Sequence, residues 1–457
     1  PRFFCGVLFK NDAMKKFTLL VIWTAFSCFA GFAQEDMPAR ASFRNGKLTF
    51  ETRDRAFRLW FDNRIYVDAA AYLPSEDVSG LMSKPNKDLE YDDGAFRFSN
   101  GMSIRRARFA VKATLYEKWF GELDLDFAYN EVELKDMFIG YRFSDRVSVK
   151  VGHFKEPMSM ERLTSSKYLI NMERPMAVEA FAGGRRLGAA ATAWGNHWWV
   201  SGGIFGRQVD IIQKEKNRGG DGYGFTARVA FSPLADRDLT LHIGGYGTWR
   251  VPEMSGKTER FVEFRTFPES RTDRRHFVRA EIFNVKSYYT VGAELAFRWR
   301  KLLVYGEYIF TELSRYGLSG GERIPLKNAS FNGWYATASY MLRGEQRRYA
   351  PEDAEFGPME VRRGGNLELA VRASNINMND FHDARAVITG GAATSYSASL
   401  NWYPNRNVLI GLNYTYMDND KYADDKGHIT LDGKPLSQML PSGLDFSILQ
   451  LRLLLSF

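Results

Sequence analysis

The chain ends in a segment whose apolar residues occupy every second position and whose last residue is phenylalanine. Leu451, Leu453 and Leu455 fall on one face together with Phe457, and Arg452 falls on the other. Successive side chains of a β-strand point to opposite faces, so this pattern predicts a strand with one apolar and one hydrophilic face. A strand that is apolar outside and charged inside is typical of a closed barrel that is surrounded by lipid and filled with water.

The other end of the chain has the pattern of a secretory signal. Met14 precedes two lysines and a long apolar run, and small residues follow at the positions expected before a cleavage site. We interpret 1–13 as an over-extended start and 14–33 as a signal peptide. Cys28 leaves a lipid-anchored N-terminus open as an alternative.

Composition agrees with an exported, strand-rich protein. Both cysteines, Cys5 and Cys28, precede residue 34, so we expect no disulfide in the mature chain. Aromatic residues make up 15% of the chain, yet its mean hydropathy is −0.34, a combination expected when apolar and polar residues alternate. The formal net charge is +8, and it falls to +5 when the four basic residues and one acidic residue before residue 34 are left out. This excess is too small to indicate an anionic partner by itself, and we expect no nucleic-acid partner.

Runs of alternating hydrophobicity predict an all-β transmembrane antiparallel β-barrel of about 16 strands over 56–457, after a short periplasmic segment at 34–55. An even number of strands places both ends of the barrel in the periplasm. The predicted strands are 56–73, 101–117, 118–129, 133–143, 146–154, 186–195, 197–206, 222–232, 238–250, 286–300, 302–313, 330–343, 365–377, 392–403, 406–417 and 444–457.

The connections between these strands alternate in length. Tight joints such as 300–301 alternate with long segments such as 251–285, as expected for short periplasmic turns and long external loops. Two joints break the alternation, since 130–132 is short where a long loop is due and 344–364 is long where a short turn is due. A large soluble β-sandwich is the alternative, because alternation is normal there too.

If the apolar face of each strand meets lipid, the opposite face lines a lumen that carries both signs of charge. Charges inside a water-filled wall avoid the cost of facing lipid and select the permeant ion. Arg105 breaks the pattern, because its parity points it to lipid, so either a β-bulge lies there or the residue sits above the apolar band. The candidate lumen-lining bases are Arg108, Lys112, Arg142, Lys150, Arg298, Arg372 and Arg452.

The long connection 155–185 is rich in basic residues and contains enough apolar residues to pack. Folded into the lumen, it would narrow the pore and present Arg162, Ser165, Ser166 and Arg174 at the constriction. Guanidinium groups suit phosphate and carboxylate because they donate paired, charge-assisted hydrogen bonds. The alternative is an external loop that caps the barrel or contacts a neighbour.

The chain resembles the phosphate-selective porins, the O and P type outer-membrane channels, over about 53–457. No single motif is diagnostic, but their order and spacing form a joint signal. The matching stretches are Gly152-His153-Phe154-Lys155-Glu156-Pro157, Leu163-Thr164-Ser165-Ser166-Lys167, Met172-Glu173-Arg174, Gly184-Arg185-Arg186-Leu187-Gly188, Ala336-Thr337-Ala338-Ser339-Tyr340 with Arg343-Gly344-Glu345, Leu400-Asn401-Trp402-Tyr403-Pro404-Asn405 and the closing strand.

The resemblance implies a homotrimer of sixteen-stranded barrels in the outer membrane of a Gram-negative bacterium. It further implies passive diffusion of small anions, with phosphate or polyphosphate as the candidate solute, through an arginine-lined pore. The implied site residues are Arg105, Arg106, Arg162, Ser165, Ser166, Arg174 and Asp136.

Two features depart from the family pattern. Arg108 stands where characterised relatives can carry an aromatic residue. The family's further arginine ladder should fall in 251–285, where several arginines align ambiguously: Arg260, Arg265, Arg271, Arg274 and Arg275.

Other functions are weaker alternatives. A general or sugar-selective porin would use aromatic residues such as Trp119, Tyr129 and Tyr168 along its path, with arginines only bracing the wall. The six histidines are widely separated, so we expect no enzyme, no cofactor and no metal site, and the chain has no spare length for an adhesin. The expected partners are anionic solutes, outer-membrane lipid and the barrel-assembly machinery, which would recognise the strand ending at Phe457.

Overall fold

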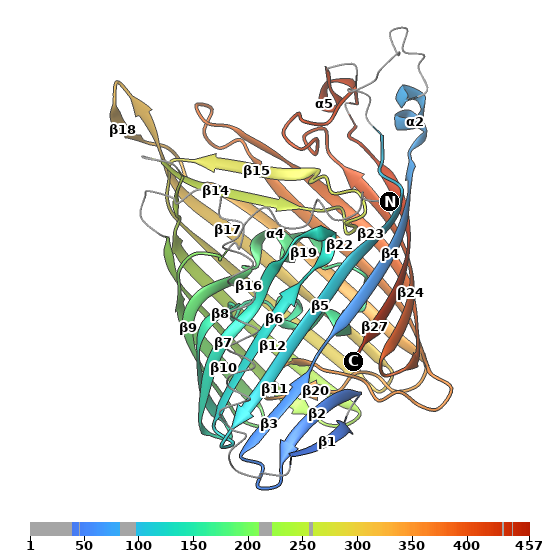
Figure 1. Ribbon diagram of the computed structural model, residues 1–457. Coiled ribbons are helices and arrows are strands. Elements are labelled where there is room, and N and C mark those ends of the chain that lie inside the picture. Colours follow the sequence, from blue (N-terminus) through green and yellow to red (C-terminus); the bar gives the residue numbers. More distant parts are fainter. Residues whose placement is uncertain are drawn as a thin grey trace, which may run out of the picture.

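The computed structural model describes residues 39–44, 46–82, 97–209, 222–255, 259–431, 434–440 and 442–457. They form a closed antiparallel β-barrel (Figure 1). The ring closes where β27 (Phe446–Ser456) pairs with β4 (Arg64–Pro74), with Leu451 opposite Ala69. The predicted over-extended start and signal peptide lie outside the described residues.

Sixteen strands of the described chain make the wall, as the alternation predicts, and most boundaries agree within a few residues. Besides β4 and β27 they are β5 (Gly101–Leu115), β6 (Trp119–Asp126), β7 (Glu133–Ser144), β8 (Val147–Lys155), β9 (Arg185–Trp194), β10 (Trp198–Phe205), β11 (Tyr223–Ala235), β12 (Leu239–Val251), β16 (Val285–Trp299), β17 (Leu302–Ser319), β19 (Ala329–Arg343), β22 (Asn366–Asp380), β23 (Ile388–Asn405) and β24 (Val408–Asn419).

The first predicted strand, 56–73, is wrong as a single element. It divides into β3 (Phe57–Phe61) and β4 because the neighbouring strand changes between them: β3 pairs with β2 (Lys47–Thr52), whereas β4 pairs with β27. β1 (Ala39–Arg44) completes a hairpin with β2. The described part of the predicted periplasmic segment 34–55 therefore extends the barrel sheet below its rim.

The two faces of the wall differ as the sequence predicts. Leu451 and Leu453 are each 51% exposed on the outside, whereas Arg452 between them is 3% exposed on the inside. The outer apolar side chains have no protein cover, and the alternation places them against lipid. Trp119 and Tyr141 form an aromatic contact near the 116–118 turn, with ring centroids 4.9 Å apart, as expected at a membrane interface.

Both exceptions to the alternation of connections are real. The short joint between β6 and β7 contains one helical turn, η1 (Ala128–Asn130). The long joint between β19 and β22 contains the small pair β20 (Tyr349–Ala350) and β21 (Glu355–Phe356). It packs against inward-facing side chains, since Trp199 Nε1 donates to the carbonyl oxygen of Glu352 at 2.9 Å.

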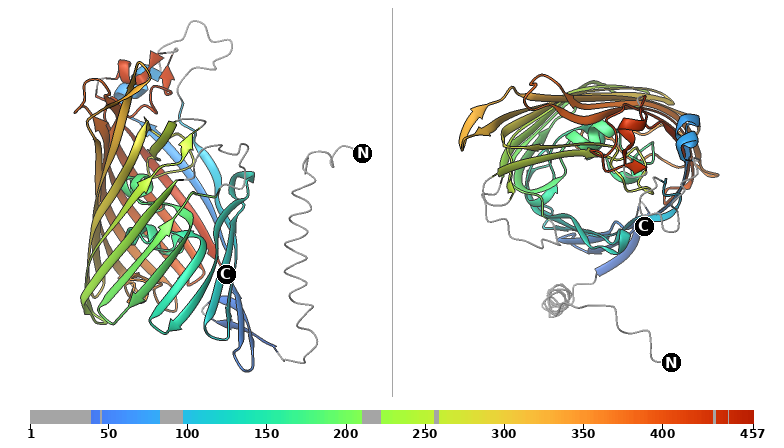
Figure 2. Two further views of the ribbon diagram at one scale, coloured as in Figure 1. Left: turned by 90° about the vertical axis from the view of Figure 1, so that its left-hand side faces the viewer. Right: turned by 90° about the horizontal axis from the view of Figure 1, so that it is seen from above.

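Two further segments lie inside the ring of strands. Seen from above in Figure 2, the helices of the 155–185 connection occupy the lumen; they are α3 (Met160–Leu163), η2 (Ser166–Tyr168) and α4 (Met176–Phe181). The pair β14 (Glu259–Thr266) and β15 (Val278–Phe283) crosses above them. Phe264 packs between Phe181 of α4 and Phe331 of the wall. Within the described residues, no helix has the length and apolarity needed to cross a bilayer.

Candidate functional site

The 155–185 connection is held by carboxylates of the opposite wall. Glu307 on β17 accepts hydrogen bonds from Ser159 Oγ at 3.0 Å and from the Glu161 backbone N–H at 2.9 Å. Glu294 on β16 accepts from the Met160 backbone N–H at 2.9 Å. Because these groups are buried, the contacts fix where the segment crosses the lumen.

A second cluster attaches the segment to the near wall. Glu173 receives both arms of Arg105, at 2.5 and 2.8 Å, and one arm of Arg452 at 3.1 Å. Arg452 also pairs with Asp68 at 2.6 Å, across the seam that closes the barrel. The side chain of Arg105 reaches the lumen because the β4–β5 register shifts at this point, with Tyr66 opposite Arg106 but Val67 opposite Ile104. The predicted β-bulge is therefore confirmed.

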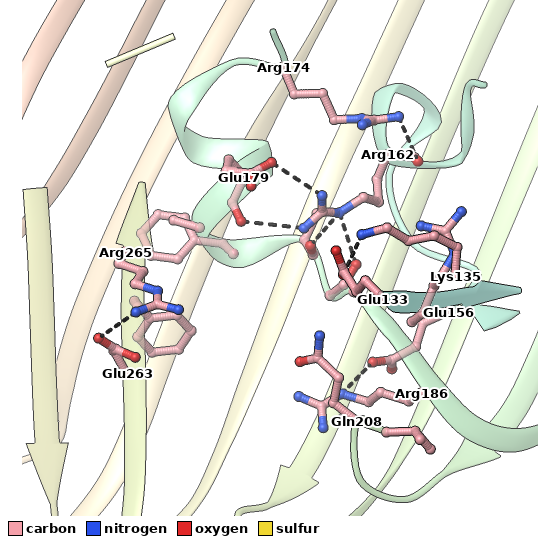
Figure 3. A pocket seen from close by; sticks show the side chains of 18 of the residues that line it. Glu133, Lys135, Glu156, Arg162, Arg174, Glu179, Arg186, Gln208, Glu263 and Arg265 are labelled. Atoms are coloured by element: carbon pink, nitrogen blue, oxygen red, sulfur yellow. Dashed lines mark hydrogen bonds and ion pairs between the residues drawn. The ribbon is translucent and has the colours of Figure 1, made fainter. Parts of the chain in front are cut away.

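Above the segment lies an outer cavity of about 780 Å³ (Figure 3). Its floor includes Arg162 and Arg174 of the segment, and β5 adds basic side chains at one side. Among the described lining residues, basic groups outnumber acidic ones. The basic lining residues are Arg105, Arg106, Arg108, Lys135, Arg162, Arg174, Arg185, Arg186, Arg250, Arg265, Arg271 and Arg274.

Below the segment lies an inner cavity of about 400 Å³. It shares Arg108, Arg174 and Arg185 with the outer cavity, so the two cavities meet at these three side chains. The remaining basic residues that line it are Lys47, Arg64, Lys112, Lys150, Lys155 and Lys167. Described bases therefore line both cavities and the place where they meet.

The structure divides the predicted site residues between these cavities. Arg105, Arg106 and Arg162 line the outer cavity, Ser165, Ser166 and Asp136 line the inner one, and Arg174 lines both. Of the predicted lumen bases, Arg108, Lys112 and Lys150 line the path. Four others face inward but line neither cavity: Arg142, Arg298, Arg372 and Arg452.

Arg142, Arg298 and Arg372 have structural contacts instead. Arg142 lies over the ring of Phe120 at 4.6 Å, near a periplasmic turn. Arg298 donates to backbone carbonyl oxygens at the same end of the barrel. Arg372 holds the inward segment by donating to the Glu173 carbonyl oxygen at 2.9 Å and by pairing with Glu269.

Arg106 differs from the other arginines of the outer cavity. Its side chain is 7% exposed, its Nε has no hydrogen-bond partner, and it has no carboxylate within ion-pair distance among the described residues. Its guanidinium carbon lies 5.7 Å from the centre of the Tyr66 ring. An unpaired buried cation at a water-filled cavity is available to a soluble anion.

Arg162 and Arg174 donate most of their hydrogen bonds to groups of their own segment. Arg174 donates to the carbonyl oxygens of Glu161 at 2.9 Å and Thr164 at 2.7 Å. Arg162 donates to the Ala182 carbonyl oxygen at 2.9 Å and pairs with Glu179 at 3.3 Å. These two arginines shape the segment and add positive charge to the field.

The electrostatics of the segment reflect this crowding of cations. Burial, together with the charge of Arg162, lowers the pKa of Arg174 to about 10. Burial would raise the pKa of Glu179, but Arg271 and Arg162 hold it at about 2. Burial and the charge of Arg265 lower the pKa of His276 to about 3. Burial is the largest cause for all three groups, and the neighbouring arginines add a positive field that keeps Glu179 ionised.

Sequence reasoning missed Arg64, Arg185 and the role of Arg271. Arg64 Nη1 lies 3.2 Å from Ser166 Oγ, beside the predicted loop hydroxyls. Arg185 pairs with Asp136 at 2.6 Å where the two cavities meet. Arg271 pairs with Glu179. The alternation along its strand predicts that Arg64 faces inward. This prediction was missed because the alternation is interrupted at Asp62, between β3 and β4.

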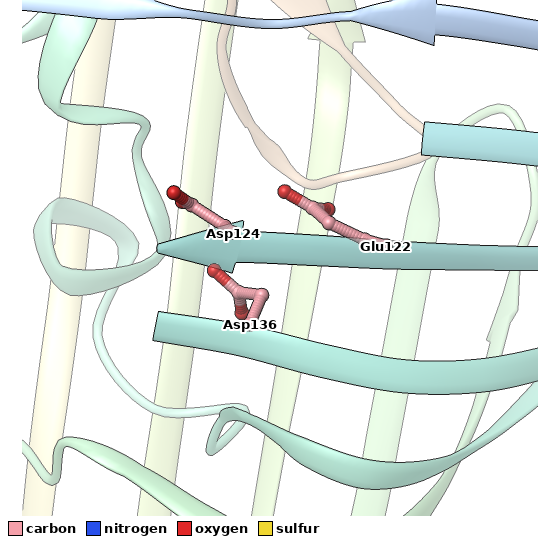
Figure 4. A group of neighbouring side chains, drawn as sticks. All are labelled: Glu122, Asp124 and Asp136. Atoms are coloured by element: carbon pink, nitrogen blue, oxygen red, sulfur yellow. The ribbon is translucent and has the colours of Figure 1, made fainter. Parts of the chain in front are cut away.

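Three carboxylates gather at the inner cavity, but their partners argue against a metal site. Glu122, Asp124 and Asp136 each offer an oxygen within 4.8 Å of the others (Figure 4). Each also forms an ion pair with a base: Glu122 with Lys112 at 3.0 Å, Asp124 with Arg108 at 3.2 Å and Asp136 with Arg185 at 2.6 Å. We assign the cluster to charge pairing within the wall.

The aromatic residues of the sugar-porin alternative are also divided. Tyr129 lines the outer cavity and Tyr168 lines the inner one. Trp119 is 50% exposed and lies on the outside of the wall, so its proposed place along the solute path is wrong. Its position follows the outward parity of β6.

A closed barrel with an apolar exterior and an inward-folded segment defines an outer-membrane porin, a channel class. Residues 86–446 match the family model described as phosphate-selective porin O and P, and the chain belongs to that family. It is 22% identical to Porin O of Pseudomonas aeruginosa over 443 residues, 91% of this chain and 95% of that protein. It is 28% identical to an uncharacterized protein of Caulobacter vibrioides over 385 residues, 82% of this chain and 71% of that protein.

Among solved structures, the chain is similar to a loop L8 deletion mutant of OmpT, an outer-membrane protein of Vibrio cholerae. The sequence identity is 9% and the TM-score is 0.49, with 88% of this chain and 100% of that chain covered.

Proposed function

We propose that this porin passes small anions in preference to cations and holds phosphate-like oxyanions, phosphate or polyphosphate, in its outer cavity. The observation that carries the proposal is the unpaired guanidinium of Arg106, surrounded by the further bases of that cavity. Bases continue into the inner cavity, so an anion meets several moderate sites in succession. Conduction requires such division, because one deep site would trap the ion.

The decisive experiment is the zero-current potential of the purified protein in a planar bilayer under a potassium chloride gradient, followed by titration with phosphate. We expect a potential of the sign that chloride permeation produces and a saturable decrease of the chloride current with phosphate. Weak selectivity without phosphate block would overturn the proposal. It would favour the general or organic-solute porin, for which Tyr129 and Tyr168 on the cavity walls provide some support.

We propose the homotrimer as the assembly and the strand ending at Phe457 as the signal read by the barrel-assembly machinery. Phe457 closes the barrel through hydrogen bonds between its backbone and that of Asn63, and its side chain is 44% exposed on the outer wall. Native mass measurement of the detergent-solubilised protein tests the assembly, and a mass of one chain would exclude the trimer.

A further inference from the structure

The inner cavity contains unpaired charges of both signs on different elements. Asp353 and Glu355 come from the inward-folded connection 344–364 and line this cavity. Neither carboxylate has a base within ion-pair distance among the described residues. The side chain of Asp353 is exposed to the cavity and that of Glu355 is partly exposed.

The unpaired bases come from β8. Lys150 Nζ lies over the rings of Phe138 and Phe154, at 5.3 and 5.1 Å, and Lys155 Nζ donates to the Leu163 carbonyl oxygen at 2.7 Å. Neither lysine contacts a carboxylate within the described part of the chain. Both line the same cavity as the two acids.

The two sets of charges are close enough to act on each other. Lys150 and Lys112 are the bases whose charges act most strongly on the Asp353 carboxyl. Lys155 is the base whose charge acts most strongly on Glu355. Because neither lysine of β8 is within ion-pair distance of Asp353 or Glu355, direct contact does not cancel these charges.

A simple anion is attracted by the lysines of this cavity and is repelled by Asp353 and Glu355. A solute with a negative group at one end and a protonated amine at the other is attracted by both the bases and the acids of the cavity. The negative end also finds hydrogen-bond donors here, since Arg64 is 4% exposed, lines the cavity and has an Nε without a partner. The Ser166 hydroxyl lies next to it, 3.2 Å from Arg64 Nη1.

We infer that the inner cavity binds and orients zwitterionic solutes, short aminoalkyl phosphates above all. Their phosphate group lies toward Arg64 and Ser166, and their amine lies toward Asp353 and Glu355. The inference rests on the proposed anion path and names a solute class for it. The 344–364 connection then acts as the selectivity element for the amine.

The test compares two blockers of equal shape in the full-length protein in planar bilayers. Phosphoethanolamine carries the amine, and propyl phosphate has a methyl group in its place. Burial and the neighbouring Asp353 raise the pKa of Glu355 to about 8, so the titrations are made at about pH 8.5, where this carboxyl is mainly ionised. We expect phosphoethanolamine to block the chloride current at an about fivefold lower concentration than propyl phosphate does. This factor corresponds to the upper range of the free energy that a solvent-exposed ion pair contributes.

The matched variants are the double change Asp353→Asn with Glu355→Gln and the control Glu352→Gln, which alters an exposed carboxylate that does not line the cavity. The double variant should lose the preference for the amine and keep the block by propyl phosphate, whereas the control should behave as the wild type does. Equal block by both compounds in the wild type, or an unchanged preference in the double variant, would overturn the inference. Inorganic phosphate separates the two proposals, since its block fails only if the anion site itself is wrong.

Discussion

At the scale of single residues, two adjacent arginines on one strand have different roles. The β-bulge turns both Arg105 and Arg106 into the lumen. Arg105 is neutralised by Glu173 through two hydrogen bonds, whereas Arg106 has no such partner. Because Glu173 neutralises the charge of Arg105, Arg105 attracts a further anion only weakly. Arg106 is therefore the stronger candidate for contact with an anion.

Replacing Arg106 with glutamine should therefore weaken phosphate block about tenfold or more. A hydrogen bond to a charged group contributes about 1.5–3 kcal/mol, and an anion at this site would lose at least one such contact. The measurement is the phosphate concentration that halves the chloride current in planar bilayers.

The matched control is Arg142→Gln, which removes the same charge from a lumen-facing residue that lines neither cavity. It should leave phosphate block within about twofold of the wild type. Equal weakening in both variants would mean that Arg106 acts only through the overall charge of the pore.

At the scale of elements, the 155–185 connection is a fixed constriction. Glu307 alone accepts hydrogen bonds from Ser159, from the Glu161 backbone, and from the hydroxyls of Tyr246 at 2.7 Å and Tyr335 at 2.8 Å. A carboxylate with several donors and only 4% of its surface exposed is costly to release. The segment therefore keeps its position while solutes pass.

Glu307→Gln should loosen this constriction, because the amide brings two donors to a position surrounded by donors. We expect stronger open-channel current noise and a lower phosphate affinity in a barrel that still inserts and conducts. Single-channel recording measures both quantities.

Glu312→Gln is the control, since Glu312 lies on the same strand and on its outer face. This variant should record as the wild type does. If the Glu307→Gln channel has the open-channel current noise and the phosphate block of the wild type, the segment is held in place by its other contacts, chiefly those of Glu294 and Glu173.

At the scale of the whole molecule, the bases of both cavities make one positive path through an otherwise mixed wall. Asp124 and Asp126, for example, neutralise Arg108 at 3.2 and 3.0 Å. Most of the bases that line the path are paired with a carboxylate, but among the described residues six have none within ion-pair distance: Arg64, Arg106, Lys150, Lys155, Arg174 and Arg274. The fields of these six bases add along the pore. Selectivity is then a property of the summed field, and single contacts modulate it.

Anion preference should therefore decrease as ionic strength increases. The Debye length shortens from about 10 Å at 0.1 M salt to about 3 Å at 1 M, so the water-filled path is screened at high salt. Zero-current potentials measured at one fixed salt ratio and increasing mean concentration provide the test. A constant permeability ratio would locate selectivity in direct contacts or pore width instead.

Most of the wall could be predicted from the sequence, and less of the site. Alternation places Arg106, Lys112 and Lys150 in the lumen from local information. It misses Arg64, because a change of neighbouring strand interrupts the alternation at Asp62. It also cannot separate Arg106 from Arg452, which have the same inward parity and opposite states of pairing.

The sequence by itself determined the closed barrel, the lipid-facing side chains and the inward basic residues. It could do so because the period of two is a local property of the extended chain. Only the tertiary structure decided which of those charges remain free. Arg105 meets Glu173 and Arg452 meets Asp68 through contacts between residues far apart in the sequence, and an ion pair depends on distances that only the closed and filled barrel defines.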